Sequence, residues 1–314
     1  MLQAPPPGLI FAAALLATAG MALVWPSLFT QWGGFPLKGL VLPLLQLIMF
    51  VMGTRVSFDG LRQVLVRPGV IGFGLGLQYF VMPFVAVGLA AAFGLAPEVA
   101  TGVLLVGAVC AGNSSNVMTF FAGGNMALSV AMTTMSTLLS PVVTPTVMRL
   151  LADREVPVEF GTMLTSIVRI VLVPVVGGLL FEQVLRRRQA MADRWLPRVV
   201  ITATCLVNGI ITANSREALL TMGATLVLVE VLHNFLGYLV GYAGARALGL
   251  DMRDAATMAM QVGIRNCGLA TGLAFDVFKS SNAALASVVF GTVQNASGAM
   301  VASYFRRHIP PRVN

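Results

Sequence analysis

A cation in the middle of an apolar segment is the residue of this sequence with the clearest chemical consequence. Arg265 lies in the sequence QVGIRNCG of residues 261–268, with no carboxylate within ten residues. An arginine at the centre of a membrane helix is unfavourable by roughly 2.5–3.5 kcal/mol on insertion scales, so such residues face the protein interior and mark functional sites. We therefore expect Arg265 to face a polar cavity and to meet an anionic substrate there.

A second run of small and polar residues interrupts another apolar segment. It has the sequence AGNSSN at residues 111–116, and Asn116 and Asn266 are 150 residues apart. A matched pair of interrupted spans indicates the binding site of a transporter, because unwound backbone exposes amides and carbonyls at the membrane midplane. Close helix packing by Gly and Ser is the alternative explanation, but it does not account for the asparagines and the arginine.

The composition is that of a membrane protein. Hydrophobic residues make up 57% of the 314 residues and charged residues only 10%, whereas soluble domains average about 25% charged. Because a span needs about 20 residues, Gly, Pro and charged residues divide the chain into ten candidates. They are residues 8–25, 37–53, 68–94, 97–122, 126–150, 160–185, 196–212, 218–247, 252–277 and 282–305. Residues 57–66 are too short and too charged to span, and are predicted to lie at the interface.

The basic residues predict the orientation. With the N-terminus inside, the inner connections hold thirteen Lys and Arg residues and the outer connections hold five. This asymmetry predicts that both termini are cytoplasmic, in a bacterial inner membrane. It also explains the formal net charge of +8 without any nucleic-acid partner.

The spacing of the interruptions predicts two halves, residues 1–155 and 156–314. Each half holds five candidate spans, and because five is odd, the second half enters the membrane from the opposite face. The expected fold is therefore all-α, with two inverted five-helix repeats.

Several short motifs resemble the bile acid:sodium symporter family at even spacing over essentially the whole chain. They are SNVMT at 115–119, GNMALSV at 124–130, STLLSP at 136–141, LHN at 232–234, VG at 262–263, GLA at 268–270 and NASG at 295–298. The resemblance implies a panel domain (spans 1, 2, 6 and 7) and a core domain (spans 3–5 and 8–10) with crossing, broken helices 4 and 9. It also implies alternating access by rocking, and transport of organic anions with sodium, such as bile acids, pantoate or keto acids.

The resemblance also implies two sodium sites, and this sequence departs from both. The first maps onto Ser115, Asn116, Ser129 and Thr133 with an acidic residue at position 261; the second maps onto Gln78, that acid and an amide at position 265. Here those two positions hold Gln261 and Arg265.

The two exchanges remove a carboxylate and add a cation. Sodium, as a hard cation, needs oxygen ligands, whereas arginine offers only donors and stays charged. In the sodium-coupled arrangement, two bound ions and one glutamate at position 261 give the site a net charge of +1. Here neutral Gln261 and charged Arg265 give the same net charge. We therefore predict a sodium-independent anion carrier in which Arg265 replaces sodium. The neutral oxygens of the first site leave weak sodium binding open.

Other polar residues fall within the predicted spans. We expect Asn113, Asn266, Gln294 and Asn295 either to bind carboxylate and hydroxyl groups of the substrate or to satisfy the broken-helix backbone. Glu230 and His233 lie three residues apart on one helical face. One alternative is that the two residues form a proton-coupling pair. Another is that Glu230 is the countercharge of Arg265 or Arg169. For His233 we favour a structural hydrogen bond.

Enzyme motifs are missing from the sequence: GxSxG, HExxH and the P-loop do not occur, and the two histidines and three scattered cysteines have no metal-ligand spacing. We expect no cofactor and no metal, a small organic anion and the lipid bilayer as partners, and no particular oligomeric state. The alternatives are a sodium- or proton-coupled symporter and, from another class, a membrane receptor or channel.

The orientation generates a first prediction. A periplasm-active reporter fused after Asn314 should be inactive in a bacterial host, whereas a cytoplasm-active reporter at the same place should be active, because the basic connections stay inside. The reverse pattern of the two reporters would show the opposite orientation.

Overall fold

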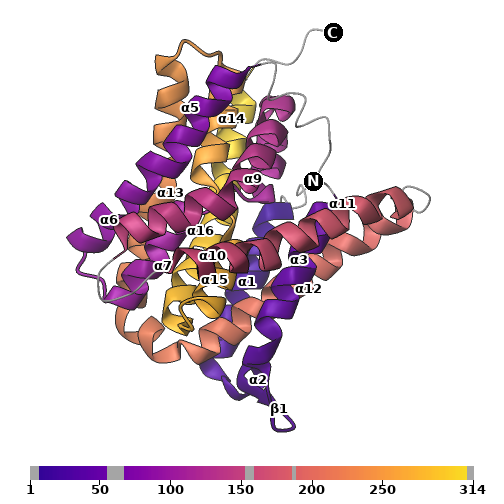
Figure 1. Ribbon diagram of the computed structural model, residues 1–314, viewed down its shortest axis with the longest axis vertical. Helices are drawn as coiled ribbons and strands as arrows, with labels where there is room; N and C mark the ends of the chain where they lie inside the picture. The colour runs from indigo at the N-terminus through magenta and orange to yellow at the C-terminus, as the bar shows by residue number, and fades with distance from the viewer. Residues whose placement is uncertain (1–6, 55–66, 153–158, 186–188, 310–314) are drawn as a thin grey trace, which may run out of the picture.

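The described chain is almost entirely helical in the computed structural model (Figure 1). The structure describes residues 7–54, 67–152, 159–185 and 189–309, and for 7–12, 182–185 and 189–194 only the backbone. The first half contains α1 (Pro7–Val24), α2 (Ser27–Thr30), β1 (Gln31–Trp32), β2 (Phe35–Pro36), η1 (Leu37–Leu40), α3 (Val41–Gly53), α5 (Pro68–Gly76), η2 (Leu77–Val81), α6 (Met82–Ala92), α7 (Pro97–Ala108), α8 (Asn113–Ala122) and α9 (Met126–Leu151). The second half contains α10 (Phe160–Ile167), η3 (Val168–Leu172), α11 (Val173–Leu185), α12 (Gln189–Asn214), α13 (Arg216–Ala247), α14 (Met252–Gly263), α15 (Cys267–Asp276) and α16 (Ser281–His308). β1 and β2 form a short antiparallel hairpin between α2 and η1.

Six helical stretches among the described residues are long and apolar enough to cross a membrane. They are Pro68–Ala92, Met126–Leu151, Phe160–Phe181, Trp195–Asn214, Arg216–Ala247 and Ser281–His308. The chain is thus a helical membrane protein, and ten spans and an inverted repeat stay predictions. The predicted interfacial segment 57–66 and several inner basic residues lie outside the described residues.

Both predicted interruptions are breaks between helices, and the two breaks contact each other. α7 ends at Ala108 and α8 begins at Asn113, while α14 ends at Gly263 and α15 begins at Cys267. The backbone N–H of Asn266 donates to the Cys110 carbonyl at 2.9 Å, and Ala111 and Arg265 form an antiparallel bridge. Backbone groups that would be unpaired in the membrane are therefore satisfied by the opposite break.

Glycine makes this close approach possible. A Cβ atom at Gly112 would lie 2.6 Å from the carbonyl oxygen of Arg265, which no side chain tolerates. Position 112 therefore has to be glycine for the two breaks to pair.

Two sets of helices pack mainly among themselves. The first set consists of α1, α3, α11 and α12. The second set includes α6, α7, α13, α14, α15 and α16, in which α13 packs on α14 and α16, and α7 packs on α6 and α16. Figure 1 shows α3, α11 and α12 on the right and α5, α6 and α13 on the left. α16 also contacts α1 and α12, and α15 contacts α3, so the two sets meet beside the helix breaks.

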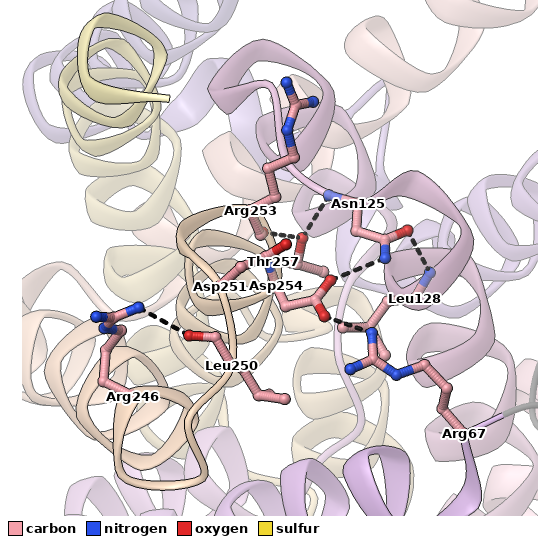
Figure 2. Close-up of polar contacts among 9 residues, drawn as sticks. All are labelled: Arg67, Asn125, Leu128, Arg246, Leu250, Asp251, Arg253, Asp254 and Thr257. Atoms are coloured by element: carbon pink, nitrogen blue, oxygen red, sulfur yellow. Dashed lines mark hydrogen bonds and ion pairs between the residues drawn. The ribbon is translucent and has the colours of Figure 1, made fainter. Parts of the chain in front are cut away.

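A polar cluster joins three elements at one end of the second set (Figure 2). The Asp254 carboxylate at the start of α14 pairs with Arg67 before α5 and accepts from Asn125 Nδ2 at 2.8 Å. The Asn125 side chain in turn caps α9 by accepting from Leu128 N at 3.2 Å, and its backbone N–H donates to Thr257 Oγ1 at 2.7 Å. Asp254 is thus a buried carboxylate whose charge is balanced.

Candidate functional site

The larger cavity beside the breaks lies between the two helix sets. It has a volume of about 280 Å³. Apolar side chains such as Leu45, Met49 and Val207 line it from α3 and α12, while Asn113 and Asn266 line it from the breaks. A molecule in this cavity would contact an apolar wall and a group of amides.

A second cavity of about 130 Å³ lies on the other side of Met49 and Met52 and shares Asn113 and Asn266 with the first. It is lined by α9 and η3–α11 and reaches Asn116 and Thr133. The breaks therefore contribute side chains to both cavities, which connects the predicted ion-site residues to the space between the helix sets.

Four of the five residues predicted for the first ion site form one hydrogen-bonded cluster. Gln261 Nε2 donates to Ser129 Oγ at 2.7 Å and to Asn116 Oδ1 at 3.2 Å. The Ser129 hydroxyl donates to Asn116 Oδ1 at 2.6 Å, and the Thr133 hydroxyl lies 3.1 Å from Gln261 Oε1. The amide N–H₂ group of Gln261 thus supplies donors to oxygens that would otherwise be free to ligate a cation.

Ser115, the fifth residue, does not join this cluster. Its hydroxyl is buried and donates to the carbonyl of Gly112 at 2.7 Å. It therefore satisfies the backbone at the start of α8.

Arg265 contacts Gln78, another of the residues predicted for the second ion site. Its side chain is 1% exposed, and Nη2 donates to the Gln78 carbonyl at 3.0 Å and Nη1 to the Val109 carbonyl at 3.3 Å. With the Gln78 amide turned so that its oxygen faces these donors, Oε1 accepts from Arg265 Nη1 at 3.3 Å and from Ala111 N at 2.5 Å. Nε has no partner among the described residues. The guanidinium is thus held by oxygens, in a site of the kind that a metal cation would use.

The local backbone explains why these oxygens are available. Gln78 lies in η2, a π-helical turn, and Val109 lies in the break after α7. In this π-helical register the N–H of Met82 donates to the carbonyl of Leu77, so the nitrogen of Pro83 stands where a donor to the Gln78 carbonyl would be. Proline has no N–H, which leaves that carbonyl free.

The four predicted substrate amides differ in what they already bind. Gln294 is engaged with the backbone of Arg265, accepting from its N–H at 2.8 Å and donating to its carbonyl at 3.1 Å. Asn266 caps α15 by accepting from Leu269 N at 3.0 Å, and Asn295 donates to the Gly291 carbonyl at 2.6 Å. The Asn113 side chain makes no hydrogen bond with another described residue. Asn113 is therefore the amide most available to a ligand. Gln294 and Asn266 support the break between α14 and α15, whereas Asn295 bonds within α16.

The Glu230–His233 pair lies in the middle of α13. Glu230 Oε2 and His233 Nδ1 are 3.5 Å apart, and both side chains are fully buried. Neither Arg265 nor Arg169 forms an ion pair with Glu230, so the expected countercharge contact is not made.

Arg169 binds a different carboxylate, which sequence reasoning did not identify. Its Nη2 lies 2.6 Å from Asp276 Oδ1, and Ser166 Oγ donates to Asp276 Oδ2 at 2.6 Å. Asp276 ends α15, whereas Ser166 and Arg169 belong to α10 and η3, so the cluster joins the two helix sets. The sequence offered one signal for this contact, namely a basic residue in the span predicted at 160–185 and an acidic residue at the outer end of the span predicted at 252–277.

Comparison with known proteins gives a consistent result. The model of the Sodium Bile acid symporter family matches residues 42–224. The uncharacterized sodium-dependent transporter YocS of Bacillus subtilis is 39% identical over 96% of this chain and 92% of its own length. The probable chloroplastic sodium/metabolite cotransporter BASS1 of Arabidopsis thaliana is 31% identical over 86% of this chain and 67% of its own length.

Asn266 generates a second prediction, because it both caps a helix and faces the cavity. Asn266→Ala should weaken anion binding at least about tenfold and should also lower unfolding free energy by about 1 kcal/mol through the lost cap. Asn266→Ser keeps a capping oxygen but loses the N–H₂ group, so it should keep most of the stability and still lose affinity. Thermal melting and calorimetric titration with pantoate measure the two effects, and unchanged affinity in both folded variants would place the anion elsewhere.

Proposed function

The chain belongs to the sodium bile acid symporter family, and from this premise we propose that it is a sodium-independent carrier of small organic anions in which Arg265 replaces bound sodium. The relatives are transporters, and this chain is a multi-pass membrane transporter rather than an enzyme. Its partners are a small-molecule substrate and membrane lipid. Carriage of anions, independence of sodium and placement in a bacterial inner membrane are the proposed refinements.

The observation that carries the proposal is the buried guanidinium of Arg265 among oxygen acceptors. A permanent positive charge that contacts the Gln78 and Val109 carbonyls leaves neither the space nor the potential for a second cation there. The charge is present in every molecule, whatever the sodium concentration.

The first ion site supports the same conclusion. The oxygen of Asn116 accepts from Ser129 and Gln261, and no carboxylate is present in the cluster to offset the dehydration of an ion. Sodium binding would require the Gln261 amide to turn and its hydrogen bonds to break.

The cavity supports an amphipathic anion as substrate. Asn113 and Asn266 lie near Arg265 at the breaks, while the wall from α3 and α12 is mostly apolar. The first peptides of α8 also place helix N–H groups at this end, where an anionic group is favoured. A carboxylate at the breaks with its hydrocarbon part against α3 fits this distribution.

The helix packing supports transport by alternating access. We assign ten spans in two inverted five-helix repeats, with the α1–α3–α11–α12 set as panel and the other set as core. The cavity separates panel from core at the breaks, whereas Arg169 and Asp276 join them at what the orientation predicts to be the outer end. This arrangement fits a state that is closed to the outside.

A sodium-coupled symporter is the second candidate, because YocS and BASS1 both have sodium in their names. It requires the first site alone to bind the ion through neutral oxygens. The two candidates differ in whether Arg265 or sodium supplies the charge that the anion needs.

Exchanging the charges tests this difference. Arg265→Gln should lower pantoate affinity at least about tenfold, because the site then holds neither a cation nor a carboxylate to bind one. The double change Gln261→Glu with Arg265→Gln restores the charge pattern of the sodium-coupled arrangement and should recover binding only when sodium is present. Calorimetric titration in sodium and in potassium buffers measures both.

Arg265→Lys is the matched control, because it keeps the charge and should keep more affinity than Arg265→Gln. Full affinity in Arg265→Gln without sodium would contradict the proposal.

The outer contact generates a further prediction. Asp276→Asn should weaken the attachment to Arg169 and increase labelling of a single cysteine at position 113 by a membrane-impermeant maleimide added outside, in a variant lacking the three native cysteines. The control is Glu98→Gln, because Glu98 accepts from Ser280 and Asn282 within the core set. Equal labelling of the Asp276→Asn, control and parent proteins would rule out a closing role for this contact.

A further inference from the structure

We propose that Glu230 is a proton-binding site and that the carrier moves one proton with each monovalent anion. This inference rests on the proposed anion transport and adds its driving force. Without sodium coupling, an anion carrier needs another coupled gradient to accumulate its substrate, and a proton that moves with the anion can supply it. Among the described residues, one buried carboxylate is suited to that role.

Glu230 differs from the other buried carboxylates among the described residues. Asp254 pairs with Arg67 and Asp276 pairs with Arg169, so both have a cationic partner within contact distance. Neither oxygen of Glu230 makes a hydrogen bond, and its only neighbour for an ion pair is His233 at 3.5 Å. A fully buried carboxylate without partners is costly in its ionised form.

The surroundings of Glu230 contain few other titratable groups. Of the elements packed against α13, η2 contributes Tyr79, and α14 is followed by the break that holds Arg265 and then by Cys267. α6 has no titratable residue, and those of α12, α14 and α16 lie outside the segments beside Glu230, mostly towards the helix ends. His233 packs its ring on Phe290, with centroids 5.5 Å apart. Arg265 is the fixed charge that interacts electrostatically with His233.

Residues that line the cavity lie next to contacts of the pair. The ring of Phe290 packs on His233, and the next residue, Gly291, lines the cavity. Cys267 lines it from the start of α15. A proton from water in the cavity would pass these residues to reach the carboxylate.

The charges explain how proton and anion would be coupled. With a neutral His233, the empty carrier holds Arg265 at +1 and ionised Glu230 at −1, which gives zero. The loaded carrier holds Arg265 at +1, the anion at −1 and protonated Glu230 at zero, which again gives zero. Either ligand alone leaves a net charge in the low-dielectric interior, so each favours binding of the other.

The proton balance is simple. On the loading face Glu230 takes one proton from water as the anion enters, and on the other face the carboxylate returns that proton to water as the anion leaves. No covalent bond to the substrate forms or breaks. The transported charge is zero, so uptake should depend on a pH gradient and not on the membrane potential.

The experiment uses the full-length protein in liposomes with radiolabelled pantoate as the probe. An inside-alkaline pH gradient should drive accumulation by wild type, and clamping the potential with potassium and valinomycin should not change it. Glu230→Gln is uncharged like the protonated form. It should lose pH-driven accumulation while its equilibrium affinity for pantoate no longer depends on pH.

Matched variants separate coupling from folding. Glu217→Gln changes an exposed carboxylate of the same helix and should behave as wild type. Glu230→Asp keeps a carboxyl group and should retain some pH-driven accumulation if the proton binds there. Accumulation by Glu230→Gln equal to wild type, or wild-type uptake that ignores the pH gradient, would overturn the proposal.

A wild type that neither binds nor moves pantoate or cholate would instead contradict the proposed anion transport on which the coupling rests. The two failures are thus distinguishable, because binding and counterflow test anion transport, whereas accumulation under a pH gradient tests the proton site.

Discussion

The guanidinium of Arg265 is the charge around which the rest of the site has to be arranged. A cation within a membrane-spanning protein needs acceptors, and the residues near it in sequence provide no carboxylate. The acceptors are instead main-chain carbonyls of Gln78 and Val109, which are free because their helices depart from regular α geometry there. The broken helices and the π-helical turn thus provide the solvation that the charge requires.

Replacing a mobile ion with a fixed one changes the thermodynamics of a carrier more than its structure. The anion still meets a positive potential at the breaks, but the sodium gradient no longer contributes to its accumulation. Any concentrative work then has to come from another ligand whose binding depends on the anion. Among the described residues, Glu230 is the buried carboxylate without a cationic partner, and this makes the proton the natural candidate.

The sequence located long helices and the two interruptions, while the predicted ten spans stay a prediction. The apolar segment predicted at 126–150 is the helix Met126–Leu151, and the polar runs around Asn116 and Asn266 contain the two breaks. The family resemblance predicted that Asn116, Ser129 and Thr133 gather around position 261, but it also placed Ser115 there, which bonds to the backbone instead. It did not predict that the Gln261 amide would supply the donors in that cluster, because the orientation of a buried amide depends on all its neighbours in space. For the same reason the sequence did not predict the Arg169–Asp276 contact. For Gln294 the sequence left two roles open, substrate binding and support of the broken-helix backbone, and in the structure its side chain bonds to the backbone of Arg265.

The most direct test of sodium replacement by Arg265 is the initial rate of pantoate uptake into proteoliposomes when sodium is replaced by potassium at constant pH and ionic strength. Because the cation of the site is part of the chain, the rates in the two salts should be equal. A collapse of uptake in potassium would contradict this prediction, since the anion would then depend on a bound sodium ion held by the neutral oxygens of Asn116, Ser129 and Thr133.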